Sequence, residues 1–63
     1  MRELFRDELA GKVWSIANDD GSVRFEVKLR GHHLQHFTIE ADAHEYFDRW
    51  APEIEKEIEL FDR

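Results

Sequence analysis

Apolar and charged residues alternate without interruption through SVRFEVKLR, residues 22–30. A period of two places successive side chains on opposite faces of an extended chain, so this stretch is predicted to form a β-strand with one apolar face. The preceding stretch KVWSIA is joined to it by the turn sequence NDDG. If those four residues form the loop, Trp14 lies opposite Phe25, and this apolar cross-strand pair stabilises the hairpin on its inner face.

A second turn follows at Gly31, and the apolar residues after it decide its length. A loop of three residues pairs Val27 with Phe37 on the inner face. The next inward pair is then Phe25 with Ile39. A slip of one residue turns every side chain of a strand over, so a two-residue loop would expose Phe37 and Ile39 to water. The pattern therefore predicts a three-stranded antiparallel meander.

From Asp42, a plausible N-cap, the apolar period changes to that of an α-helix. Pro52 interrupts this helix, because proline cannot donate to the carbonyl of Asp48. A single helix kinked at Pro52 is favoured over two helices that divide there, since Ala51 is a poor N-cap. The predicted apolar stripe comprises Ala43, Phe47, Trp50, Ile54, Ile58 and Phe61.

The first residues, RELFRDELAG, carry Leu4, Phe5 and Leu9 at near-helical spacing, with Gly11 placed as a C-terminal cap. They predict a short N-terminal helix. The fold class expected for residues 1–63 is therefore α+β, in one small domain of α-β-β-β-α order. In this fold the long amphipathic helix packs on one face of the sheet.

The composition narrows the chemistry that this chain can perform. It has 63 residues and no cysteine, so neither a disulfide framework nor a thiolate metal site is available. No apolar run approaches the roughly 20 residues of a membrane span, and the charged start of the chain lacks the apolar stretch of a secretory signal. We expect a cytoplasmic protein. No nucleophile or cofactor motif is present, and so small a sheet has little room for a pocket, so we expect neither catalysis nor a bound cofactor.

Three histidines in RGHHLQHF, residues 30–37, raise the question of a metal site. On an extended chain, His32 and His36 would lie about 13 Å apart, too far for one zinc ion. The predicted register places His32 and His33 in the loop and turns His36 outward beside Lys28. His44 belongs to the following helix. The pattern therefore favours surface histidines over a metal centre.

The net charge of −6 is concentrated at one end of the chain. Residues 1–39 hold six acidic and six basic side chains, whereas residues 40–63 hold nine acidic and three basic ones. An acidic surface repels phosphate backbones and attracts basic proteins. Five of the acidic residues recur at helical spacing beside the apolar stripe: Glu45, Asp48, Glu55, Glu59 and Asp62.

This acidic row predicts a small protein-binding module, an inhibitor or adaptor that engages a basic surface of a partner protein. In a sharper form of the hypothesis, the row imitates nucleic-acid phosphates, as several small phage-encoded proteins do. The alternative reading of the row is a solvated helix face. A competing functional hypothesis is nucleic-acid binding by the outer sheet face, where four side chains gather: Arg24, Lys28, Arg30 and His36.

The long helix is predicted to outreach the sheet. A helix of about 20 residues spans about 30 Å, whereas strands of seven to nine residues span about 23–30 Å. The apolar residues past Pro52 then need cover from the N-terminal helix or from another chain. The second option predicts a homodimer, with self-association through Ile54, Ile58 and Phe61.

Overall fold

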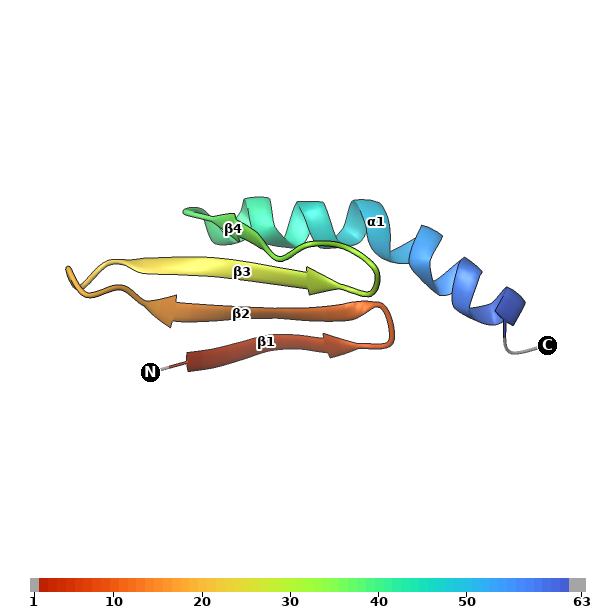
Figure 1. Cartoon of the computed structure of the whole chain (residues 1–63). Helices are drawn as coiled ribbons and strands as arrows, with labels where there is room; N and C mark the ends of the chain where they lie inside the picture. The colour runs from red at the N-terminus through yellow and green to blue at the C-terminus, as the bar shows by residue number, and fades with distance from the viewer. Residues whose placement is uncertain (1, 62–63) are drawn as a thin grey trace.

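The computed structural model describes residues 2–61, with side chains from Glu3 onward, and shows an antiparallel sheet with one helix packed on it (Figure 1). The strands follow one another in the order β1-β2-β3-β4 across the sheet. The α+β class and the C-terminal helix on one sheet face are confirmed. The elements are β1 (Arg2–Glu8), β2 (Gly11–Ala17), β3 (Val23–Leu29), β4 (Gln35–Phe37) and α1 (Glu40–Phe61).

The predicted N-terminal helix is wrong, and with it the count of three strands, because this segment forms β1. A β-bulge between Leu4 and Arg6 leaves Phe5 without a partner in β2. The bulge breaks the alternation of a strand, so the apolar spacing resembles that of a helix. A two-residue turn at Leu9 and Ala10 then leads into β2.

The register between β2 and β3 differs by one residue from the prediction. Trp14 lies opposite Glu26, not Phe25, and Ser15 takes the place opposite Phe25. The connecting loop has five residues between Ala17 and Val23, one more than expected. Because a one-residue slip exchanges the two faces, Trp14 lies on the outer face of the sheet instead of under the helix.

The loop between β2 and β3 is held by its own polar groups. The backbone N–H of Asn18 donates to the Ser22 carbonyl at 2.7 Å. The hydroxyl and the N–H of Ser22 donate to Asp20 Oδ1 at 2.5 and 2.9 Å. The hydroxyl's hydrogen bond is the main cause that lowers the pKa of Asp20. These bonds explain how an irregular five-residue connection keeps one conformation.

The edge strand β4 faces as predicted but pairs two residues away. Phe37 lies opposite Phe25, and both point toward the helix. His36 lies opposite Glu26 rather than beside Lys28. The strand ends at Phe37, so Ile39 does not join the inner face and is 57% exposed.

Helix α1 is a single element that contains Pro52. It begins at Glu40, so the predicted cap at Asp42 is wrong: the Ile39 carbonyl accepts the first bonds, from Asp42 N at 3.2 Å and Ala43 N at 3.3 Å. The ribbon changes direction in its second half and runs beyond the end of the sheet (Figure 1). At about 1.5 Å per residue, 22 helical residues span about 33 Å, against about 23 Å for the seven of β3.

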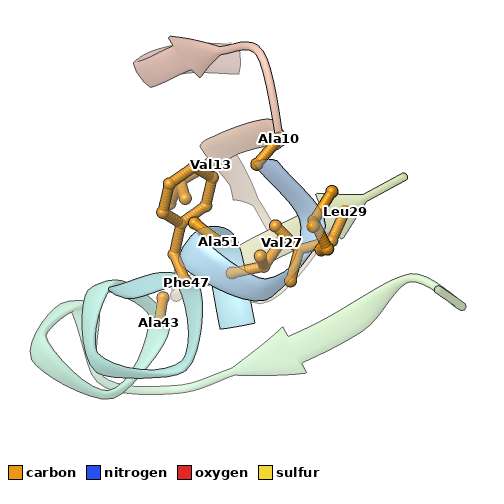
Figure 2. Close-up of a cluster of buried hydrophobic side chains, with 8 residues drawn as sticks. Ala10, Val13, Val27, Leu29, Ala43, Phe47 and Ala51 are labelled. Atoms are coloured by element: carbon orange, nitrogen blue, oxygen red, sulfur yellow. The ribbon is translucent and has the colours of Figure 1, made fainter. Parts of the chain in front are cut away.

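The core lies between α1 and the inner face of β2 and β3, and Phe47 is its largest fully buried side chain. Its ring reaches from the helix toward Val13 of β2 (Figure 2). Ala43 and Ala51 lie one turn before and one turn after Phe47, so two small side chains let the helix approach the sheet closely. The predicted burial of Trp50 is wrong. Its side chain flanks this row and is 38% exposed, and Ala51 takes the buried position.

Gly11 allows β2 and β3 to approach each other at the start of β2. A Cβ atom on this residue would lie 2.1 Å from the Lys28 carbonyl oxygen and 2.8 Å from Leu29 Cα. Both are backbone atoms, which cannot turn aside as a flexible side chain can. Gly11 is therefore needed for strand packing, and not as the helix cap that the sequence indicated.

Phe47→Ala should destabilise the fold far more than Trp50→Ala. Removal of a fully buried phenylalanine leaves a cavity and costs about 3–5 kcal/mol, whereas Trp50 is more than a third exposed. Urea unfolding of both variants and the wild type measures the difference. An equal or larger loss for Trp50→Ala would contradict the packing described here.

Gly11→Ala should destabilise the sheet by about 1–3 kcal/mol, because the added methyl group forces two backbones apart. Lys12→Ala is the matched control, since Lys12 is the next residue of β2 and is exposed. Thermal unfolding of the two variants tests this. A Gly11→Ala variant that melts with the control would rule out the close approach.

Candidate protein-binding surface of the C-terminal helix

Arg6 fixes the position of α1 relative to β1. The bulge at Phe5 leaves Arg6 on the inner face, opposite Val13. Its guanidinium carbon lies 4.0 Å from the centroid of the Phe47 ring, and it donates to Asp48 and to Glu8, each at 2.7 Å. The Glu8 hydrogen bond is the main cause that raises the pKa of Arg6 above its ordinary value. The Arg6 guanidinium therefore covers the edge of the core at Phe47 and binds the helix at Asp48.

This contact gives one member of the acidic row, Asp48, a structural role. Asp48 remains 65% exposed at its side chain but has one oxygen bound by Arg6. Glu45 and Glu59 are exposed, and Glu55 is half-buried. Asp62 lies outside the described residues. The structure therefore keeps Glu45, Glu55 and Glu59 on the helix surface and assigns Asp48 a structural contact as well.

The second half of α1 is more acidic than the row alone suggests. Glu53 and Glu57 are exposed and lie on the opposite side of the apolar stripe from Glu55 and Glu59, because residues four apart share a helix face. Lys56 is the one base between Glu53 and Glu59, and the last turn of the described helix holds no basic residue. Carboxylates thus border the apolar stripe on both sides. A helical projection past Pro52 would have revealed this second border.

The residues predicted for self-association have three different environments. Ile54 is 5% exposed and belongs to the core of its own chain. Ile58 is half-buried against that core. Phe61 is 87% exposed, and its neighbour Leu60, which the stripe did not include, is 64% exposed. Of the three predicted residues, Phe61 at the end of the helix is therefore the one most available to another molecule.

The outer sheet face has a buried carboxylate at its centre. The side chain of Glu26 is 5% exposed and accepts a hydrogen bond from Trp14 Nε1 at 2.8 Å. It also lies 3.5 Å from Arg24 Nε and 3.1 Å from His36 Nδ1. Trp14 is only 8% exposed. The sequence does not predict this cluster, because the register expected from it places Trp14 on the other face.

The basic side chains of this face make contacts within the protein itself. Arg24 and His36 both pair with Glu26. Lys28 Nζ donates to the carbonyl of Leu29 at 3.0 Å and to that of His32. Arg30 is exposed. Three of the four side chains that would contact phosphate therefore already have acceptors within the chain.

The histidines lie in separate places. His36 pairs with Glu26 across the sheet. The His32 ring lies 5.9 Å from that of Trp50, and His44 lies 3.3 Å from Glu40 one helical turn away. Within residues 2–61, no three histidine or carboxylate side chains converge as metal ligands do.

No known protein family, curated protein or solved structure matches this chain. In the part of the chain that the structure describes, no helix has the length and apolar character that crossing a membrane requires.

Arg6→Ala should lower the free energy of unfolding by about 1–2 kcal/mol, because it removes the cation over Phe47 and the ion pair to Asp48 together. Arg30→Ala, at an exposed arginine, is the control and should change stability by less than about 0.5 kcal/mol. Urea unfolding gives both values. If the two variants unfold at the same urea concentration, Arg6 does not hold the helix.

Proposed function

We propose that this chain is a small protein-binding module, an inhibitor or adaptor, that engages a basic surface of a partner protein through α1. The observation that carries the proposal is the second half of this helix. It extends beyond the sheet (Figure 1). It also exposes Leu60 and Phe61 and holds four glutamates against one lysine. Exposed apolar residues bordered by charge are typical of a binding surface.

The two kinds of side chain would have separate roles. Exposed carboxylates such as Glu59 attract a basic partner over a distance and speed the encounter. Burial of Leu60 and Phe61 against the partner would then supply most of the affinity, since each removes apolar surface from water. This division favours a partner whose basic surface includes an apolar depression. In the sharper version, the basic surface is one that otherwise binds nucleic acid.

The outer sheet face is the weaker candidate. Arg24, Lys28 and His36 all have acceptors within the chain, and an incoming phosphate would compete with the buried Glu26 carboxylate. Single-stranded nucleic acids also rely on exposed aromatic rings for stacking. Trp14, the aromatic residue on this face, is 8% exposed. These contacts support the helix over the sheet as the binding surface.

The exposed end of α1 also bears on the proposed homodimer. Two copies that bury Phe61 against each other would bring their glutamates close together, which opposes association at low salt. A homodimer of this kind therefore strengthens as salt rises, whereas binding of a basic partner weakens. Sedimentation of the purified chain at low and high salt tests for such a homodimer.

Reversal of Glu55 and Glu59 to lysine should abolish partner capture and leave the fold intact. In a pull-down from the source organism, the wild type is compared with this variant and with Lys12→Glu/Arg30→Glu, which reverses two exposed cations of the sheet. With the captured partner in hand, the association rate should fall as salt rises, because exposed charges are screened over about 8–10 Å at physiological ionic strength. Capture that is lost only on the sheet reversal would assign binding to the sheet.

A further inference from the structure

Trp50 separates two hollows on the side of α1 that faces β4. The first has a volume of about 380 Å³ and lies toward the end of the helix, beside His32, Glu53 and Glu57. The second has a volume of about 440 Å³ and lies toward its start, beside Asp42, Glu45 and Tyr46. Arg49 and Trp50 line both hollows. The indole thus forms a shared wall that is 38% exposed, and we call this region the Trp50 groove.

The Trp50 groove combines aromatic rings with carboxylates. The Trp50 ring lies 5.9 Å from His32 on one side, and in the other hollow the Tyr46 ring lies 5.5 Å from Phe37. Each hollow carries two carboxylates, so four carboxylates and the Arg49 guanidinium give a formal charge of −3. This pairing of an exposed indole with carboxylates suits a cation, which is attracted by both.

Arg49 of the same chain already makes a cation–π contact with Trp50. Its guanidinium carbon lies 5.7 Å from the centroid of the Trp50 ring, inside the range of a cation–π contact. A guanidinium therefore reaches this ring, while the four carboxylates around it leave the surface short of positive charge. A ligand that supplies two further cationic groups, one to each hollow, would reduce the imbalance.

We infer that the Trp50 groove binds a lysine- or arginine-rich segment of a partner protein, with one cationic side chain in each hollow beside the indole. The inference rests on the proposed function in that the partner is basic, and it names the part of the partner that is recognised. Its site differs from that of Glu55 and Glu59, which lie on the other side of the apolar stripe, although Glu45 of the acidic row lines the second hollow. Nucleic acid is disfavoured by the sign of the charge.

The first test uses a labelled synthetic peptide of alternating arginine and glycine, with a glutamine-for-arginine peptide as its control, and the full-length chain. Fluorescence anisotropy at low salt should show binding of the arginine peptide alone. Trp50→Ala should weaken it about tenfold or more, which corresponds to about 1.4 kcal/mol for the loss of a partly desolvated cation–π contact. Trp50→Phe keeps an aromatic face and should lose less. Equal affinity of Trp50→Ala and wild type would overturn the inference.

The second test separates the groove from general attraction to an acidic helix. Glu53→Gln/Glu57→Gln and Glu55→Gln/Glu59→Gln remove the same charge from opposite sides of the helix. The first variant should weaken peptide binding about five- to tenfold, and the second less than about twofold, because the first pair lines a hollow of the Trp50 groove and the second pair lies on the other side of the helix. Equal losses would show that the peptide follows net charge only, and the groove would then have no specific role. If Trp50→Ala does not fold, these two glutamine variants still test whether the peptide binds in the groove.

The same variants distinguish this inference from the proposed function. If Glu55→Lys/Glu59→Lys abolishes partner capture while Trp50→Ala and Glu53→Gln/Glu57→Gln leave capture and peptide binding unchanged, the module stands and the groove fails. If the peptide binds in the groove and no protein is captured, the groove stands and the module fails. Replacement of Arg49 by glutamine removes the competing guanidinium and should tighten peptide binding, whereas weaker binding would count against a cation site.

Discussion

Close contact between α1 and the sheet at Phe47 is the interaction on which the rest of the structure depends. The ring fills the space over Val13, and Ala43 and Ala51 on either side leave no bulk to hold the helix away. This contact sets the rotation of the helix about its axis. Once the rotation is set, Asp48 meets Arg6 and Trp50 stands at the flank. The exposed carboxylates of the helix are then Glu40, Asp42, Glu45, Asp48, Glu53, Glu57 and Glu59. The proposed binding surface is therefore a consequence of core packing.

Much of this fold could be predicted from the sequence, and the failures have a common cause. The strict alternation in β3 and the helical period of α1 were both informative, since each pattern runs for several residues in one phase. The N-terminal strand was missed because its bulge at Phe5 disrupts the alternation. The turn that follows, Leu9 and Ala10, contains none of the residues that usually mark turns. A bulge or an unusual turn of this kind leaves no periodic pattern of apolar residues in the sequence.

The errors around tryptophan arose from the assumption that the largest apolar side chains lie inside. The register of β2 instead turns Ser15 inward, opposite Phe25, and Trp14 outward, opposite Glu26. On the helix, likewise, the small side chain of Ala51 is buried, and the larger Trp50 is partly exposed beside it. Outside the core, Trp14 is sheltered by a hydrogen bond to buried Glu26. Trp14 lies at the buried carboxylate of the outer sheet face, and Trp50 lies beside the carboxylates of the helix. The candidate sites therefore could not be predicted while both indoles were expected in the core.

The acidic second half of α1 has a consequence for the helix itself. Aligned peptide dipoles leave the amino end of a helix partly positive and the carboxyl end partly negative. Glu40 and Asp42 match the first end, whereas the last described turn has no base to match the second, and Glu57 and Glu59 lie near it. Helical order is therefore electrostatically favoured at the sheet and opposed beyond it. A basic partner that docks on the overhang would relieve that opposition, so recognition and helix formation reinforce each other.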